Sequence, residues 1–196
     1  MDIVETLASA AIIPVIVIED PKKAVPLARA LVAGGLPVIE VTFRTAAAAA
    51  AIAAIRANVP EAIVGAGTIL TIGQLHDARK AGAVFGVAPG FDPVILEEAR
   101  DSLFPFMPGV STASELSCAL RAGALMVKFF PAEAAGGVKT IKALLGAFRF
   151  TGVKFMPTGG VNLLNLADYL AIPEIVAVGG TWIAPAKMIA AEDWAG

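Results

Sequence analysis

Lys128 is a cation inside an apolar run, LMVKFFP, which spans residues 125–131. Burial disfavours the charged ammonium, so an amine in this position loses its proton more easily. A neutral amine attacks carbonyl carbon and can form a Schiff base. The alternative is a structural lysine that reaches solvent or pairs with a carboxylate. Lys154 begins the next apolar run and is expected to be solvated instead.

Glu40 is a second charge in apolar surroundings, within VIEVTF at residues 38–43, and Arg44 follows directly. A buried carboxyl group that exchanges protons near neutral pH would serve as a general acid or base. Arg44 would bind a substrate carboxylate through two parallel N–H donors. The alternative is a structural ion pair between Glu40 and Arg44.

Two glycine pairs, Gly159-Gly160 and Gly179-Gly180, follow the last two apolar runs of the chain. If these runs are barrel strands, this is where phosphate commonly binds, on backbone N–H groups and a helix N-terminus. Thr181 adds a hydroxyl donor. Either pair alone is more often just a tight turn, so the prediction depends on both pairs occurring together.

The elements that would position these residues alternate along the chain. Eight short runs are almost continuously apolar, which is typical of strands buried on both faces. The eight runs span residues 13–18, 37–43, 62–67, 84–89, 104–110, 125–131, 154–160 and 175–180. Helices are expected at residues 3–10, 21–33, 45–58, 71–81, 92–100, 112–122, 138–148 and 162–170.

Capping residues support these helix boundaries. Asp20 before Pro21, Thr112 three residues before Glu115, and Asn162 are typical helix-start signals. Helix ends are expected at the glycines of positions 34–35, 82, 123 and 146.

The alternation predicts an α/β fold, a (β/α)8 TIM barrel that forms one domain over residues 1–196. In such a barrel the chemistry lies at the C-terminal ends of the strands, where Glu40, Lys128 and the glycine pairs fall. A doubly wound open sheet is the alternative, which eight evenly spaced units make less favourable.

Composition excludes several classes of protein. The 196 residues are 57% hydrophobic and 16% charged, against about 25% charged in an average globular protein. A net charge of −2 gives no electrostatic footprint for nucleic acid. One Cys and one His exclude an internal disulfide and a zinc cluster built from those ligands. No membrane span and no signal peptide are expected, so the predicted location is cytoplasmic.

Eight motifs, in order, resemble the 2-keto-3-deoxy-6-phosphogluconate (KDPG) aldolase family, whose members also act on 4-hydroxy-2-oxoglutarate (KHG). The resemblance covers nearly the whole chain, and its lysine motif is highly specific. The motifs are PVIV (14–17), EVTFRT (40–45), GAGT (65–68), PG (89–90), PGVST (108–112), KFFPAE (128–133), PTGG (157–160) and GGTW (179–182).

The resemblance implies a class I aldolase that needs no metal or other cofactor. It implies Lys128 as the Schiff-base lysine and Glu40 as the acid/base. It places Arg44, Thr68 and Thr158 around the pyruvate carboxylate and hydroxyl groups, and Phe130 and Pro89 as apolar walls of the pocket. It places Gly159, Gly160 and Thr181 at the phosphate, where Gly179 and Gly180 also fall. The implied substrate is a keto-acid sugar phosphate. The implied assembly is a homotrimer, and the mean hydropathy of +0.77 also predicts burial against other copies.

Three departures from the family lie outside the implied site. The last helix is expected to be truncated, the helix at 45–58 is nearly all alanine, and Leu163, Leu164 and Leu166 crowd the helix at 162–170. A smooth apolar outer surface is what a second protein interface would need, natural or engineered. The chain is therefore expected to be a working aldolase or a trimeric building block of a larger assembly, two readings that are compatible. An alanine-rich natural aldolase is the alternative explanation of this surface.

Overall fold

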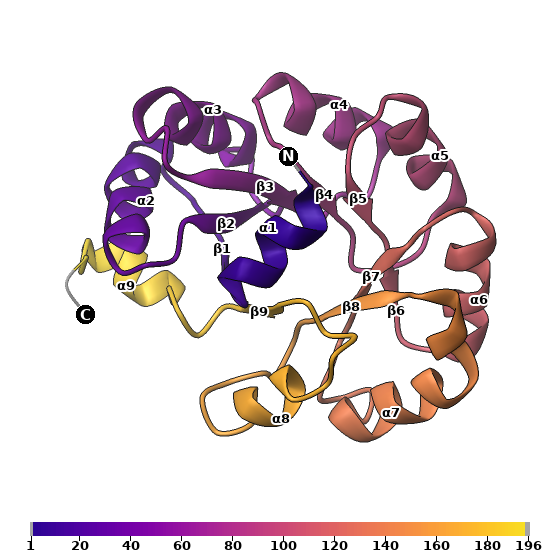
Figure 1. Ribbon diagram of the computed structural model, residues 1–196. Helices are drawn as coiled ribbons and strands as arrows, with labels where there is room; N and C mark the ends of the chain where they lie inside the picture. Colours follow the sequence, from indigo (N-terminus) through magenta and orange to yellow (C-terminus); the bar gives the residue numbers. More distant parts are fainter. Residues whose placement is uncertain (1, 195–196) are drawn as a thin grey trace.

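The computed structural model describes residues 2–194 as parallel strands surrounded by helices (Figure 1). Every strand pair is parallel, as the continuous apolar runs predict. The strands are β1 (Ile12–Ile16), β2 (Val38–Thr42), β3 (Ile63–Gly67), β4 (Gly86–Val87), β5 (Phe106–Met107), β6 (Gly109–Val110), β7 (Met126–Phe129), β8 (Lys154–Pro157) and β9 (Val178–Gly180).

The ladders form two curved sheets, ordered β5-β4-β3-β2-β1-β9 and β6-β7-β8, instead of one closed ring. The predicted strand at 104–110 is split at Pro108, which has no N–H to donate to a ladder. Between β8 and β9 there are only two isolated bridges, Phe155–Ile175 and Thr158–Gly179. The α/β class is confirmed. The sequential strand order also differs from a doubly wound sheet, in which the order reverses.

In Figure 1 the helices surround the strands on their outer side, except for α1, which lies across the middle of the ring. They are α1 (Ile3–Ala10), α2 (Ala24–Ala33), α3 (Ala48–Asn58), α4 (Ile72–Lys80), α5 (Pro93–Asp101), α6 (Ala113–Arg121), α7 (Gly137–Phe148), α8 (Leu166–Leu170) and α9 (Ala186–Ala191), with 3-10 turns η1 (Pro21–Lys23) and η2 (Arg149–Thr151). None of the helices within residues 2–194 has the length and apolar character needed to cross a bilayer.

Two of the expected helix starts and one expected stop are wrong. Asn162 does not open a helix, because its side chain accepts a hydrogen bond from the N–H of Leu164 and closes a turn; α8 begins only at Leu166. Thr45 also lies outside its helix, and its hydroxyl donates to the carbonyl of Ile18 at 2.6 Å. Gly146 lies inside α7, which continues to Phe148.

Helix α1 closes the end of the strands that is opposite to the predicted site. Asp2 caps this helix by accepting from the N–H of Val4 at 2.8 Å. Leu7 is wholly buried and packs with residues at the strand starts, among them Ile13, Val38 and Met126. The strand starts therefore form a closed apolar floor, and the opposite ends are left for chemistry.

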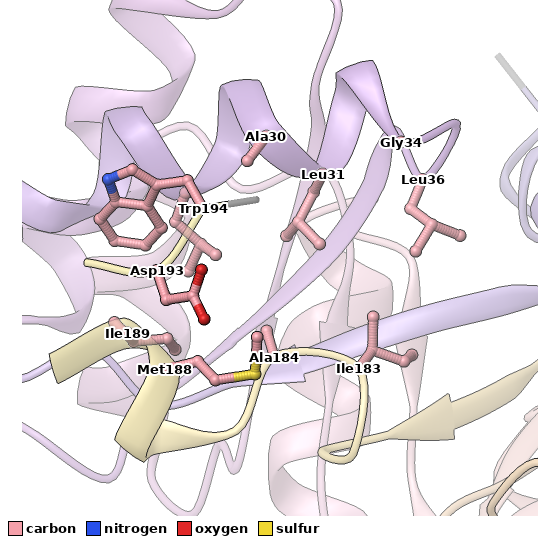
Figure 2. Close-up of a pocket in the computed structure, with 11 residues that line it drawn as sticks. Ala30, Leu31, Gly34, Leu36, Ile183, Ala184, Met188, Ile189, Asp193 and Trp194 are labelled. Carbon is pink, nitrogen blue, oxygen red and sulfur yellow. The ribbon is translucent and has the colours of Figure 1, made fainter. Parts of the chain in front are cut away.

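The segment after β9 packs against α2, on the side of the chain where the sequence predicts a shortened last helix. Helix α9 has six residues, and Ile189 is buried in the core cluster that also contains Leu31. Leu31 of α2, Met188 and Trp194 are among the residues that line a cavity of about 170 Å³. Figure 2 shows these side chains. The apolar surface beside β1 and β9 is thus largely covered by residues 183–194.

The predicted outer surfaces differ in their exposure. In α3 the residues Ala48, Ala51, Ile52 and Ile55 are buried, and Ala50 is exposed. Leu163 and Leu164, which precede α8, are 72% and 96% exposed. Leu163 and Leu164 therefore lie outside the helix that was expected to contain them.

Helix α6 provides a test of the capping signals. Glu115 accepts hydrogen bonds from the N–H and hydroxyl groups of both Ser111 and Thr112, at 2.8–3.1 Å. These bonds, above all the one from the Ser111 N–H, lower the pKa of Glu115 from its ordinary value of 4.5. Because folding lowers this pKa, the stabilisation is present above pH 4.5 and is lost as the pH falls through the folded value.

Glu115→Gln should therefore lower the free energy of unfolding at pH 7 by about 1 kcal/mol, the usual size of a helix-cap contribution. The difference from the parent should be smaller at pH 3 than at pH 7, because more of the parent carboxylate is protonated at the lower pH. Urea unfolding of both proteins at the two pH values measures it. An equal difference at both pH values would contradict the charged capping box.

Candidate active site

Lys128 and Glu40 meet in the interior between the strands. Lys128 on β7 is 3% exposed and Glu40 on β2 is wholly buried. The Lys128 Nζ donates to Glu40 Oε1 at 3.3 Å. Strands β2 and β7 lie in different sheets, so this ion pair spans the space that the two sheets enclose. The structural pair between Glu40 and Arg44, considered as an alternative, is not formed.

Two buried side-chain oxygens of predicted site residues have no hydrogen-bond partner among the described residues. They are Oε2 of Glu40 and the hydroxyl of Thr158, a residue that is 5% exposed and follows β8 directly. Buried polar groups in folded proteins are almost always paired, so such exceptions point to a ligand or a catalytic role. The unpartnered oxygens and the Lys128 amine together offer a proton acceptor, a hydroxyl and a nucleophile.

Glycines make room for both unpartnered groups. A Cβ on Gly67 of β3 would overlap the carboxylate of Glu40, and a Cβ on Gly179 of β9 would overlap the Thr158 hydroxyl. The GAGT motif is thus required sterically, because Glu40 fills the side-chain space of Gly67. This role of Gly67 is not among the sequence predictions, although a glycine inside a strand pattern indicates close approach of another group.

Phe130 and Pro89 lie on the same ends of the strands. The Lys128 Nζ is 5.5 Å from the centroid of the Phe130 ring, a distance at which a cation is attracted by an aromatic face. Phe130 and Pro89 are half-buried. Gly109 packs so tightly on the backbone of Pro89 that it has no space for a side chain.

Thr68 follows β3 directly, and Arg44 lies two residues after the end of β2. Thr68 has a φ of +58°, a left-handed conformation that threonine rarely adopts. Strain of this kind is concentrated at functional sites, where surrounding structure holds it. Arg44 is exposed and forms no ion pair within residues 2–194, so its guanidinium is available to a ligand.

The predicted phosphate residues lie at the ends of β8 and β9. Gly159 and Gly160 have φ values of +99° and +83°, which only glycine adopts readily. In the described part of the chain, the amides of Gly160 and Thr181 donate to no protein oxygen. Gly179 and Gly180 are buried within β9, and Thr181 is exposed. A helix N-terminus contributes less than expected, since α8 starts only at Leu166 and has five residues.

Gly67→Ala tests the steric argument. The added methyl would displace the Glu40 carboxylate from Lys128, so turnover should fall as far as in Glu40→Gln, by roughly 10²–10⁴-fold, the usual contribution of a general acid/base. Steady-state kinetics of both variants measures this. Gly73→Ala in α4, where a Cβ would meet only ordinary contacts, is the matched control and should keep parental activity. Parental activity in Gly67→Ala would show that the carboxylate is placed differently.

Comparison with known proteins agrees with this geometry. The family model described as KDPG and KHG aldolase matches residues 3–196. The chain is 48% identical over 192 residues to the 2-dehydro-3-deoxy-phosphogluconate aldolase of Treponema pallidum, covering 98% of this chain and 90% of that protein. It is 47% identical over 188 residues to the KHG/KDPG aldolase of Escherichia coli K12, covering 96% and 87%.

A solved structure shows a similar arrangement of the backbone. The KDPG aldolase of Legionella pneumophila, with pyruvate captured as a covalent carbinolamine intermediate, superposes with a TM-score of 0.92 at 44% identity. The superposition covers 97% of this chain and 92% of that one. On the family match and the identities together, the chain belongs to the KDPG and KHG aldolase family of carbon–carbon lyases.

Proposed function

We propose that this aldolase cleaves 2-keto-3-deoxy-6-phosphogluconate to pyruvate and glyceraldehyde 3-phosphate through a Schiff base on Lys128, and that it also cleaves 4-hydroxy-2-oxoglutarate. The observation that carries the proposal is the buried Lys128–Glu40 pair together with two polar oxygens without partners. No other described lysine is buried with a carboxylate in this way. The names of the similar proteins support the same pair of substrates.

The mechanism begins with a proton transfer within the pair. Lys128 gives a proton to Glu40, and the neutral amine attacks the C2 ketone of the substrate to form a carbinolamine. Glu40 returns the proton to the carbinolamine hydroxyl, which leaves as water, and an iminium remains. The positive iminium nitrogen is the electron acceptor for the next step.

Cleavage of the C3–C4 bond follows. Glu40, through a water molecule, removes the proton of the C4 hydroxyl, C4 becomes an aldehyde, and the bonding electrons form an enamine with the iminium. The enamine takes a proton at C3, and water hydrolyses the resulting iminium to pyruvate and free Lys128. Each proton removed is returned, so the cycle leaves the enzyme unchanged.

The remaining site residues are proposed to bind the substrate. Arg44 and Thr68 would bind the carboxylate, the hydroxyl of Thr158 would bond a substrate hydroxyl, and Phe130 and Pro89 would form apolar walls. The phosphate would lie on the amides at the glycine pairs, Gly159-Gly160 and Gly179-Gly180, and on Thr181. The free amides of Gly160 and Thr181 support this placement.

The two sheets are proposed to form one (β/α)8 barrel. Strands β5 and β6 are consecutive and are interrupted only by Pro108, and the isolated bridges join β8 to β9. The Lys128–Glu40 contact across the enclosed space supports a closed arrangement. A cytoplasmic location is also proposed and fits the single cysteine of the chain.

Borohydride trapping tests the nucleophile. With pyruvate and borohydride, the parent should gain one reduced pyruvate adduct on Lys128, and Lys128→Ala should lose both the adduct and turnover. Lys154→Ala, which removes a half-buried lysine at the start of β8, is the control and should keep both. Peptide mapping locates the adduct. Labelling of Lys154, or of the Lys128→Ala protein, would overturn the assignment.

A homotrimer is proposed as the basic assembly, and a larger assembly built from trimers as a second candidate role. An additional contact between chains is supported by the exposed side chains of Leu163 and Leu164 and by the alanine-rich outer face of α3. The outer helices mainly supply stability in barrels, so such a contact would not disturb the strand ends.

Charges on this outer surface test the second role. Leu164→Asp or Ala50→Asp should dissociate a larger assembly into trimers of about 60 kDa, three times the 20.0 kDa chain. Aldol cleavage per active site should stay near the parental rate. Light scattering with size-exclusion chromatography measures the mass. If the parent is itself a trimer of that mass, or if both variants keep a larger parental mass, the additional interface is wrong.

A further inference from the structure

Tyr169 is the only tyrosine of the chain, is wholly buried in α8, and lies outside the proposed reaction. Its hydroxyl donates a hydrogen bond to Oε1 of Glu133, which follows Lys128 in the KFFPAE motif. Burial and the bonded Glu133 carboxylate raise the pKa of Tyr169 well above its ordinary value of 10.0, so the phenol keeps its proton and remains a donor. The bond therefore ties α8 to the segment that leaves β7.

The segment around Glu133 is bonded to the glycine turn at the end of β8. The amide of Ala132 donates to the carbonyl of Thr158 at 2.8 Å, and the amide of Glu133 donates to the carbonyl of Gly159 at 3.0 Å. The Cβ of Glu133 lies so near Gly160 that a Cβ on that glycine would be only 2.6 Å away. Glu133 is thus packed directly on the Gly159-Gly160 turn.

The same turn is held from its other side by the residues before α8. The side-chain amides of Asn162 and Asn165 donate to the carbonyl of Gly160, at 3.1 and 3.3 Å. Tyr169 lies one helical turn after Asn165. The residues just before α8 therefore hold the Gly160 carbonyl, and Tyr169, near the end of α8, holds the Glu133 carboxylate.

Because Glu133 carries a negative charge, the direction in which its carboxylate points affects the binding of a phosphate. Its carboxylate lies beside the turn on which a phosphate is proposed to bind, and two like charges repel when they are close. The bond to Tyr169 fixes the carboxylate on the α8 side. Without that bond, the exposed side chain of Glu133 is free to turn toward the Gly160 amide and compete with the phosphate.

We propose that Tyr169 and Glu133 are positioning residues that hold the Gly159-Gly160 turn ready for a phosphate, and that they thereby set the preference for phosphorylated over unphosphorylated keto acids. This inference rests on the proposed function, since it needs both substrates. It assigns these two residues no contact with the substrate and no part in the proton transfers.

Tyr169→Phe removes the hydroxyl, keeps the buried ring, and leaves the exposed Glu133 solvated. KM for 2-keto-3-deoxy-6-phosphogluconate should rise about tenfold, the usual effect of one lost hydrogen bond to a charged group. The kcat for this substrate should change less than KM. Both constants for 4-hydroxy-2-oxoglutarate should stay near parental values, and so should borohydride trapping of pyruvate, because Lys128 is not disturbed.

Two further variants separate the proposed positioning role from the general effect of losing a hydrogen bond. Glu133→Gln keeps an oxygen that accepts from Tyr169, so KM for the phosphorylated substrate should remain at or below the parental value. Thr151→Val removes another hydroxyl hydrogen bond, to the carbonyl of Phe148, at the opposite end of the same β8 unit. It should leave the ratio of the two KM values unchanged.

The outcomes distinguish this inference from the proposed function. If the parent cleaves neither substrate, or only the unphosphorylated one, the proposed function fails in whole or in its phosphate part, and the inference fails with it. If the parent cleaves both, the inference alone is overturned by a Tyr169→Phe variant that leaves both KM values unchanged or raises them equally.

Discussion

The buried ion pair between Lys128 and Glu40 limits what can surround it inside the protein. Removing two charges from water costs several kcal/mol for each ion, and a buried pair repays this only with good geometry. At 3.3 Å the pair has one hydrogen bond, and Oε2 of Glu40 has none within the described chain. A site that is incompletely satisfied when empty gains those missing bonds from its ligand, so the energy cost of the empty site favours binding.

The two ends of the strands serve different purposes, and the sequence at each end reflects this. At the strand starts, Leu7 of α1 packs with apolar side chains such as Ile13 and Val38 into a buried floor. At the strand ends, glycines replace side chains so that Glu40 and Thr158 have room. A rigid floor and an open, glycine-lined top allow one small chain to be stable and yet hold an unsatisfied polar site.

Local patterns predicted much of this arrangement. The apolar runs gave the parallel strands within a few residues, and the Thr112–Glu115 pair gave the start of α6, because strand burial and helix caps depend on neighbouring residues. Lys128 and Glu40 stood out because each is a charge in an apolar run. Asn162 was misleading because its side chain closes a local turn, and Thr45 because its hydroxyl bonds the distant carbonyl of Ile18. Gly146 was misleading because α7 continues past it to Phe148. The contact of Gly67 with Glu40 and the bond of Tyr169 to Glu133 join distant elements, and no local pattern reports them.

The overlap of Gly67 with Glu40 has a consequence for how this sequence can change over time. The side-chain space of residue 67 is already filled by the carboxylate of residue 40, so the two positions share one volume. A larger residue at 67 requires a shorter one at 40, and a shorter acid no longer reaches Lys128. Either change alone damages the site, and the two changes together relieve the overlap without restoring the contact with Lys128. The effect of a substitution at one of these residues therefore depends on the other, an epistatic relation between positions that lie 27 residues apart in the chain.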